Sequence, residues 1–156
     1  MFRVLLPCLI LWNGLFLEAS PLGRQKTTLF LLGIVEIGEK NYYISLEKSN
    51  WFEASNHCRR KGGFLLTLES MEELELLSPF LHPAYSYWLS INDLGVRGEY
   101  VSEATGLEAP FLNWSVGQPD NGDGDDRCVE LWRSTSSFRM SDSSCRMSVA
   151  FICQLN

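Results

Sequence analysis

Apolar residues recur at strand spacing and then at helical spacing in the first half of this 156-residue chain. Residues 41–47 (NYYISLE) are rich in aromatic and β-branched side chains, which predicts a strand. Ser49 begins a predicted helix over residues 50–61, and the Gly62-Gly63 pair ends it. One side of this helix is expected to face the core. That side consists of Trp51, Ala54, Ser55 and Cys58.

A second helix is predicted by a capping signal rather than by a long periodic pattern. After a short buried strand over residues 64–68, Ser70 and Glu73 have the spacing of a capping box. The helix that they open runs through Leu77, and Pro79 ends it. These two segments carry the clear helical patterns of the chain.

The second half has short apolar runs separated by Gly, Asn, Asp and Pro, a pattern typical of strands joined by turns. Regular spacing disappears over residues 106–127, and so long a loop in a compact domain is usually functional or disordered. We therefore expect one α+β domain with two helices, small antiparallel sheets and a long loop. The predicted strands cover residues 88–91, 99–101, 128–132, 138–141 and 150–154.

The first residues have the layout of a secretory signal peptide, with a positive start at Arg3, an apolar stretch and a cleavage site near Ala19. The stretch is too short to cross about 30 Å of hydrocarbon, and Pro7 and Asn13 interrupt it, so membrane insertion is not expected. The sequence thus predicts a secreted, extracellular protein. Its expected order is a signal peptide (1–19), a leader segment (20–40) and the domain (41–156).

Net charge and cysteine number narrow the class of protein. A net charge of −6 argues against nucleic-acid binding, because phosphates are bound by Lys and Arg. Cys8 lies in the predicted signal peptide, and an even number of remaining cysteines in an oxidising compartment suggests two disulfides of open pairing. No Cys-x-x-Cys pair is present, so a zinc site is not expected. The remaining cysteines are Cys58, Cys128, Cys145 and Cys153.

The long loop carries carboxylates at Asp120, Asp123, Asp125 and Asp126. Like charges this close repel one another unless a cation lies between them, and oxygen ligands on a Gly-rich loop suit calcium. Composition by itself favours the simpler alternative of a solvated acidic loop. An EF-hand that starts at Asn121 does not fit, because Asp126 then stands where a Gly is needed.

With these segments in place, the chain resembles the C-type lectin-like domain family over residues 41–155. Trp88-Leu89-Ser90-Ile91 is similar to the Trp-Ile-Gly-Leu core strand of the family. Asn113-Trp114 and Gly117-Gln118-Pro119-Asp120 match its long-loop signature. Met140-Ser141-Asp142 stands where members usually have Trp-Asn-Asp. The order of these marks, with the closing cysteines, resembles short-form, secreted single-domain lectins of the insect kind.

The resemblance implies two disulfides, a metal and a ligand. It pairs Cys58 with Cys153 and Cys128 with Cys145. It places Ca2+ on five residues that also hydrogen-bond the sugar, with amides donating and carboxylates accepting. Its Gln-Pro-Asp order implies galactose-type sugars, so the expected partners are glycans or glycoproteins bound without catalysis, and oligomerisation stays open. The five residues are Gln118, Asp120, Asp126, Ser141 and Asp142.

Several positions depart from the family pattern. Ser141 is shorter than the usual Asn and Asp126 is shorter than the usual Glu, and each change weakens the expected calcium shell. Gly122 stands where galactose-binding members often place an aromatic ring, so Trp132 or another ring would have to take that role. These departures motivate an alternative, a calcium-independent domain that recognises a protein or another surface ligand. A secreted hydrolase with paired carboxylates is a third hypothesis, for which no partner motif exists.

Three further expectations concern the loop and its surroundings. The peptide bond before Pro119 is typically cis in calcium-bound members of the family. The auxiliary calcium site of the family is expected to be lost, because Arg97 and Arg127 occupy two of its acidic positions. The sequon that begins at Asn113 predicts N-glycosylation of that residue.

Overall fold

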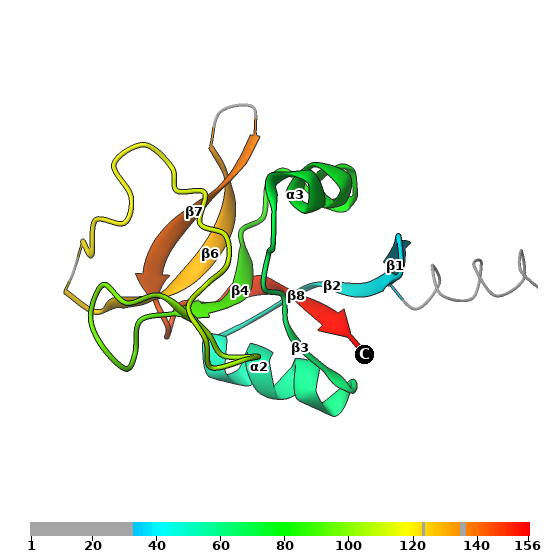
Figure 1. Cartoon of the computed structure of the whole chain (residues 1–156), viewed down its shortest axis with the longest axis horizontal. Helices are drawn as coiled ribbons and strands as arrows, with labels where there is room; N and C mark the ends of the chain where they lie inside the picture. The colour runs from blue at the N-terminus through cyan, green and yellow to red at the C-terminus, as the bar shows by residue number, and fades with distance from the viewer. Residues whose placement is uncertain (1–32, 123, 135–136) are drawn as a thin grey trace, which may run out of the picture.

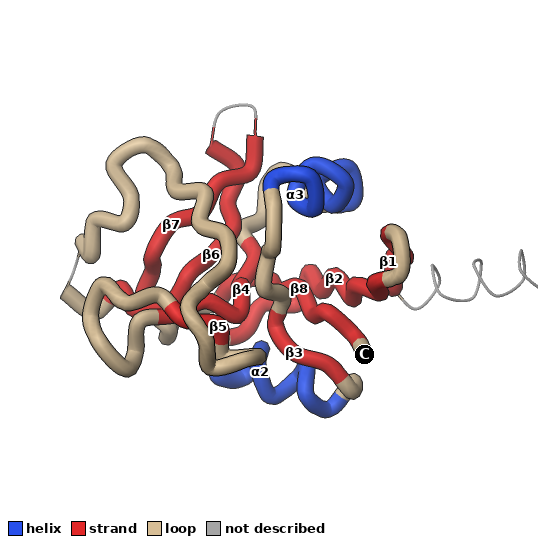
Figure 2. The backbone as a smooth tube through the Cα atoms, in the orientation of Figure 1, coloured by secondary structure: helices blue, strands red, loops and turns tan. Residues whose placement is uncertain are grey.

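The fold is α+β, with two helices packed against one sheet (Figures 1 and 2). The computed structural model describes residues 33–122, 124–134 and 137–156, so the predicted signal peptide lies outside the described residues. No helix within those ranges is long and apolar enough to cross a membrane. The elements are β1 (Ile34–Ile37), β2 (Lys40–Ser49), α2 (Trp51–Arg60), β3 (Gly63–Leu65), α3 (Met71–Leu77), the 3-10 helix η1 (Ser78–Phe80), β4 (Tyr87–Asn92), β5 (Val101–Ser102), β6 (Asp126–Ser134), β7 (Ser137–Ser144) and β8 (Val149–Leu155).

The strands form one eight-stranded mixed sheet with the path β1-β2-β8-β4-β6-β7. β3 pairs with β8, and β5 pairs with β4. All pairs are antiparallel except β4 with β8, where Tyr87 lies opposite Ala150 and Trp88 opposite Phe151. The sequence predicted small antiparallel sheets, but this single parallel pair joins the strands into one mixed sheet. Periodicity predicts strands but not their partners, so the sequence could not indicate the parallel pair.

β1 falls in a stretch where the sequence showed no clear pattern. Its residues pair antiparallel with β2, with Ile37 opposite Lys40 across a turn in which Gly38 has φ 61°. Three of its four side chains are only half-buried, so apolar and polar positions do not alternate cleanly. Residues 34–37 therefore contribute an edge strand that the hydrophobic pattern did not indicate.

Helix α2 begins at Trp51, one residue later than its predicted first residue, Asn50. Asn50 is its N-cap, and the Asn50 side chain accepts a hydrogen bond from the Glu53 backbone N–H at 3.0 Å. The Glu53 carboxylate accepts in return from the Asn50 backbone N–H at 3.4 Å, which completes a capping box. The apolar side of α2 is buried as predicted.

Helix α3 has only half of its predicted capping box. Ser70 Oγ accepts from the Glu73 backbone N–H at 3.1 Å, but the Glu73 carboxylate does not return to the N-cap. It accepts instead from Tyr42 Oη at 2.6 Å, from Lys40 Nζ at 3.0 Å and from the Glu69 backbone N–H at 2.7 Å. Burial and then the Glu73 hydrogen bond raise the pKa of Tyr42, so its phenol remains a donor. Glu73 thus fastens α3 to β2.

Both disulfides, Cys58–Cys153 and Cys128–Cys145, are formed as the family resemblance implied. The first joins α2 to β8, and the second joins β6 to the turn after β7. Closing loops of 95 and 17 residues stabilises the fold by about 3–5 kcal/mol each. Both lie in an apolar cluster with Trp51.

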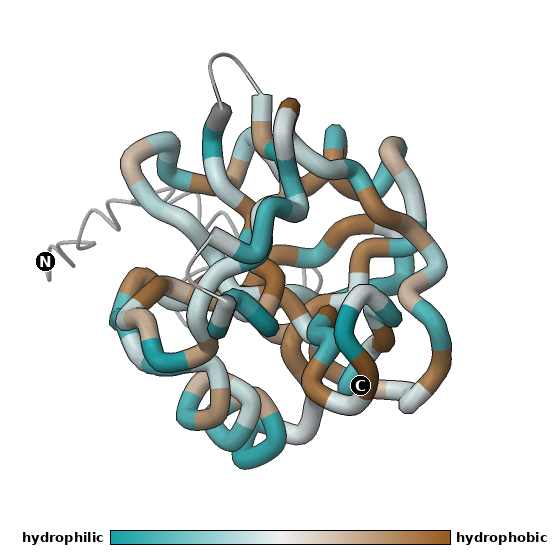
Figure 3. The backbone as a smooth tube through the Cα atoms, turned by 90° about the vertical axis from the view of Figure 1, so that its left-hand side faces the viewer, coloured by the Kyte–Doolittle hydropathy of each residue, from teal (hydrophilic) through white to brown (hydrophobic). Residues whose placement is uncertain are grey.

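A larger apolar cluster fills the space between α3 and the sheet, and includes Leu74, Leu77 and Leu131. Figure 3 shows hydrophobic positions concentrated along the central strands and hydrophilic ones along the outer loops. Two tryptophan side chains link separate elements of the fold through hydrogen bonds. Trp51 Nε1 donates to the Leu89 carbonyl at 2.8 Å, and Trp88 Nε1 donates to the Ser49 carbonyl at 3.0 Å. β6 and β7 are therefore held on a fixed core.

Replacing Glu73 by Ala is expected to lower the free energy of unfolding by about 2–3 kcal/mol, because Tyr42 and Lys40 lose their buried acceptor. Urea unfolding followed by tryptophan fluorescence measures the effect. The matched control is Glu72→Ala, at an exposed position on the same helix. Equal stability of the two variants would show that the Glu73 network does not hold α3 in place.

Candidate functional site

Asp142 on β7 is the hub of the candidate site. Its side chain is buried at 5% exposure, and its carboxylate accepts two backbone hydrogen bonds from the long loop. Asp142 Oδ1 accepts from the Asp120 N–H at 3.1 Å, and Oδ2 accepts from the Asn121 N–H at 2.8 Å. The Asp142 backbone N–H donates to Gln118 Oε1 at 3.3 Å. One residue of the sheet therefore positions three consecutive parts of the loop.

The loop reaches Asp142 because it first runs beside β7, as the yellow segment of Figure 1 shows. Trp114 forms a parallel bridge with Met140, and the Ser115 N–H donates to the Met140 carbonyl at 2.8 Å. The Gln118 N–H then donates to the Ser115 carbonyl at 3.0 Å. The Gln118–Pro119 peptide bond is cis, as the resemblance led us to expect.

Carboxylate oxygens of Asp120 and Asp126 both lie beside Gly122. A Cβ at Gly122 would lie 3.4 Å from Asp120 Oδ1 and 3.4 Å from Asp126 Oδ2. Asp120 Oδ1 also accepts from the Gly122 N–H at 3.1 Å. Asp125 turns away from them and accepts from Ser144 Oγ at 3.3 Å, while Asp123 lies outside the described residues. The acidic loop is thus ordered around two of its carboxylates.

Ser141 completes the set of five predicted residues. It is 9% exposed, and its hydroxyl donates to the Asp142 carbonyl at 3.1 Å. The serine oxygen therefore lies beside the backbone carbonyl oxygen of Asp142. Hydrogen bonds link Gln118, Asp120 and Ser141 directly to Asp142, and Asp126 lies beside Gly122, as Asp120 does.

The chemistry of this donor set fits a hard cation. Every candidate donor is a carboxylate, amide, hydroxyl or carbonyl oxygen, and calcium takes six to eight such oxygens. Asn121 Oδ1 adds a buried oxygen for which the described residues supply no hydrogen-bond donor. Those residues contain no group of three or more His, Cys, Asp or Glu already arranged to hold a metal. Both Asp142 oxygens accept N–H groups instead, so a cation would share that carboxylate with the loop.

Arg127 and Arg97, which stand at positions that the resemblance assigns to the auxiliary calcium site, both donate to nearby oxygens. Arg127 Nε donates to Asp93 Oδ1 at 2.6 Å, and the same guanidinium donates to the Asp93 carbonyl. Arg97 donates to the Gly124 carbonyl at 2.5 Å, on the acidic loop itself. Loss of the auxiliary calcium site stays a prediction, and the two guanidinium groups supply positive charge beside the acidic loop.

Sequence reasoning missed two titratable residues beside the hub. Tyr100 packs its ring against Trp114 with centroids 4.8 Å apart, and burial, then Asp142, raises the pKa of Tyr100 to about 12. Glu130 lies opposite Ser141 in the β6–β7 register. Burial, opposed by a hydrogen bond with Ser86 and reinforced by Asp126, raises the pKa of Glu130 to about 7. The sequence signal that could have identified Glu130 was its position inside an otherwise apolar run, residues 128–132 (CVELW).

Trp132 and Asn113 lie on the flank of the site. Trp132 is 37% exposed, and its Nε1 donates to Ser115 Oγ at 2.8 Å, so the indole is fixed against the loop. Asn113 Oδ1 accepts from Arg139 Nη1 at 2.6 Å. Glycosylation of Asn113 stays a prediction, as does a sugar-stacking role for Trp132.

A family model described as the Lectin C-type domain matches residues 47–155, which is more than half of the chain. The chain therefore belongs to the C-type lectin domain family. Lectins of this family bind carbohydrates and are not enzymes, and C-type lectin domains generally bind Ca2+. Membership supports a carbohydrate-binding lectin function for this chain.

Similar proteins agree with this assignment over most of the chain. C-type lectin 37Db of Drosophila melanogaster is 70% identical over 156 residues, which cover 100% of this chain and 99% of that protein. Perlucin of Haliotis laevigata is 31% identical over 126 residues, which cover 79% of this chain and 81% of that protein. The mouse scavenger receptor C-type lectin carbohydrate-recognition domain superposes with a TM-score of 0.72 at 26% identity, over 78% of this chain and 93% of that domain.

The raised pKa of Glu130 predicts a specific pH dependence of stability. The folded carboxyl binds its proton more tightly than the unfolded one, so the free energy of unfolding should fall as pH rises from 4.5 to above about 7. Glu130→Gln is expected to remove this part of the slope and to be more stable than the native chain above pH 7. Urea unfolding across that interval in calcium-free buffer is the test, and parallel pH profiles for the two proteins would contradict it.

Proposed function

We propose that this chain is a secreted, calcium-dependent lectin for galactose-type sugars. The observation that carries the proposal is the convergence of Gln118, Asp120 and Ser141 on Asp142. A solvated acidic segment would have no need of the two hydrogen bonds that anchor this loop to the Asp142 carboxylate. These bonds give the loop a fixed arrangement of oxygens, which a metal site requires.

The residues proposed to hold Ca2+ are Gln118, Asp120, Asp126, Ser141 and Asp142. When bound, the ion would supply direct coordination of two neighbouring sugar hydroxyls. The same side chains would also hydrogen-bond these hydroxyls. The Gln118 amide donates to a hydroxyl oxygen, and the carboxylates accept from hydroxyl hydrogens. The hydrogen bonds to Asp142 keep Gln118 and Asp120 in place before the sugar arrives.

Sugar selectivity is proposed to follow from the order of amide and acid around Pro119. Here the amide precedes the proline and the acid follows it, which is the order that accompanies galactose-type sugars in this family. Reversing the order exchanges a donor for an acceptor at each hydroxyl. An axial and an equatorial 4-hydroxyl present their hydrogen and lone pairs in different directions. The exchange therefore changes which sugar can form all of its hydrogen bonds with the two side chains.

Secretion is supported by the layout of the first 19 residues and by the two disulfides, which persist in oxidising compartments. The partners are then extracellular glycans or glycoproteins. A single site of this kind binds weakly, so an oligomer or a clustered ligand would raise the avidity. N-glycosylation of Asn113 would place a glycan on the flank of the same loop.

A calcium-independent lectin-like domain is the second candidate function. It is favoured by one observation: Asp142 already has both carboxylate oxygens occupied by N–H groups of the loop, and Ser141 occupies its carbonyl. A site satisfied by internal hydrogen bonds can keep its shape without a metal. The exposed surface beside it would then bind a protein or another surface ligand directly.

Asp142→Asn is expected to weaken calcium binding by at least ~10-fold and to abolish retention on immobilised galactose, because it removes the central charge of the donor set. Calorimetry with calcium and a galactose column run with and without EDTA measure both effects. Asp125→Asn, on the same loop but bonded to Ser144, serves as the control and should change neither. Absence of any calcium heat in the native protein would favour the second candidate function.

Exchanging the order of acid and amide tests the origin of selectivity. The double variant Gln118→Glu with Asp120→Asn is expected to keep calcium affinity, since the number of charges and oxygens is unchanged. Its preference should move from galactose-type towards mannose-type sugars, because each hydroxyl now meets the opposite hydrogen-bonding group. Competition by the two free sugars on a glycoprotein-coated surface gives the readout. An unaltered preference would mean that selectivity lies outside these two residues.

A further inference from the structure

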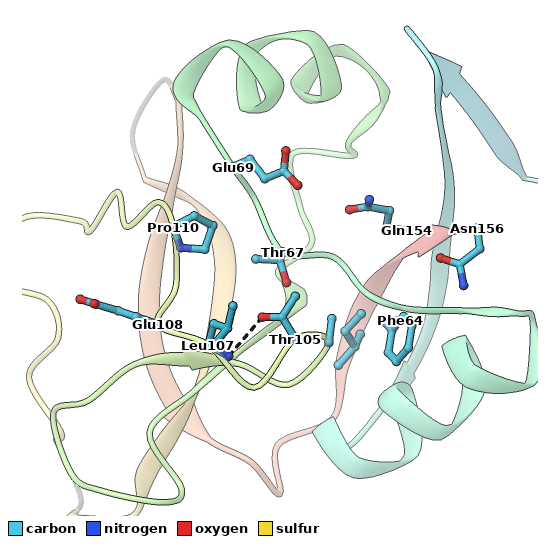
Figure 4. A pocket seen from close by; sticks show the side chains of 11 residues that line it. Phe64, Thr67, Glu69, Thr105, Leu107, Glu108, Pro110, Gln154 and Asn156 are labelled. Atoms are coloured by element: carbon cyan, nitrogen blue, oxygen red, sulfur yellow. Dashed lines mark hydrogen bonds between the residues drawn. The ribbon is translucent and has the colours of Figure 1, made fainter.

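A pocket lies away from the loop site, between β3, the end of β8 and residues 104–110 (Figure 4). Its volume is about 370 Å³, which is large enough for a small organic ligand. The lining includes buried Leu65 and Thr67, together with apolar side chains from Phe64, Leu107 and Pro110. In Figure 1, β3 and the end of β8 lie to the right of β4, whereas the acidic loop lies to the left.

Backbone hydrogen bonds hold this pocket in a fixed shape. The Ser102 N–H donates to the Leu107 carbonyl at 2.8 Å, and the Leu107 N–H donates to Thr105 Oγ1 at 3.2 Å. Thr67 Oγ1 and Ser102 Oγ lie 2.6 Å apart, which fixes Thr67 to the neighbouring strand. The strand segment behind it is held by the Leu66 N–H, which donates to the Ile152 carbonyl at 2.9 Å. A ligand would therefore meet a preformed surface and lose little affinity to ordering of the protein.

Polar side chains also line the pocket, and they belong to Thr67, Glu69, Thr105, Glu108, Gln154 and Asn156. Figure 4 shows Glu69 and Gln154 extending towards each other above Thr67, with Thr105 on the opposite side. The described residues supply no hydrogen bond to the Gln154 side-chain amide. Lys40 Nζ lies 2.8 Å from Glu69 Oε2, which partly neutralises that carboxylate, and no Lys, Arg or His lines the pocket. The rim between Glu69 and Gln154 thus presents an amide donor and acceptor and a carboxylate acceptor, with the Thr67 hydroxyl below them.

These features exclude several ligand classes. An anion would lie beside Glu69 with no basic side chain lining the pocket to receive it. A wholly apolar molecule would bury the Gln154 amide without a partner, at a penalty of about 1–3 kcal/mol. A ligand with one apolar face and one hydroxyl-bearing edge satisfies both sides, since its C–H groups can pack on Phe64 and Leu107 while its hydroxyls meet Glu69 and Gln154.

We propose that this pocket is a second, calcium-independent binding site for a neutral sugar residue. Phe64, Leu107 and Pro110 contact the C–H face of the ring. The Gln154 amide donates to and accepts from hydroxyls, and the Glu69 carboxylate accepts from a hydroxyl. The site uses none of the residues proposed to hold Ca2+, so one chain would contact a branched glycan at two separate places.

The test is a titration of the 15N-labelled protein with methyl glycosides of galactose, glucose and mannose, in buffer that contains EDTA. At least one sugar is expected to shift the backbone amides of Thr67, Thr105 and Leu107, with a dissociation constant of ~1–50 mM. Gln154→Ala and Phe64→Leu should each weaken this binding by at least ~5-fold. Asn56→Ala, at an exposed position on α2, is the matched control and should bind as the native chain does.

The loop site is followed in a parallel titration in buffer that contains calcium in place of EDTA, through the amide signals of Gln118, Asp120 and Asp142, so loss of one site does not hide the other. The proposal is overturned if no sugar shifts the pocket amides in EDTA. It is also overturned if acetate or a simple alkyl amine shifts them as strongly as the sugars do, or if a lysine-rich peptide alone does so. Unaltered sugar binding by both pocket variants, with native unfolding midpoints, overturns it as well.

Discussion

The arrangement of the loop depends on one carboxylate, that of Asp142, which accepts the backbone N–H groups of Asp120 and Asn121. Hydrogen bonds to a charged group in a buried setting contribute about 1.5–3 kcal/mol each, more than neutral ones. The loop between Gly106 and Asp126 has few regular backbone bonds of its own. Its proposed ligands would otherwise sample many conformations, and a metal would then have to supply the ordering free energy.

The rest of the fold keeps Asp142 where the loop can reach it. β7 is paired along its whole length with β6, and the Cys128–Cys145 disulfide closes the far end of that hairpin. Trp114 bridges to Met140 and so lays the loop along the outer side of β7. The same strand therefore supplies Ser141 and Asp142 to the site and the register for Gln118. A lectin domain built this way places its recognition chemistry on a loop while the sheet and disulfides supply the rigidity.

The sequence predicted the local elements well, because helices and strands follow from the spacing of apolar residues within a short window. It missed β1, whose half-buried residues give no clean alternation of apolar and polar positions. It also predicted that the Glu73 carboxylate would cap its own helix at Ser70, whereas this carboxylate binds side chains of β2. Tyr42 and Lys40, which take that carboxylate, lie about thirty positions away in the sequence, where no local rule applies. The parallel pairing of β4 with β8 was missed for the same reason.

The candidate site was predictable only through the family resemblance, since composition alone favoured a solvated acidic loop. The resemblance identified Gln118 and Asp142, but it did not show that Asp142 binds the loop backbone or that Glu130 lies opposite Ser141. The most direct measurement is a crystal structure grown in saturating calcium with galactose. The account predicts one ion bonded at about 2.3–2.6 Å to oxygens of Gln118, Asp120 and Asp142, with two sugar hydroxyls completing its shell. Those three side chains surrounding only solvent under the same conditions would contradict it.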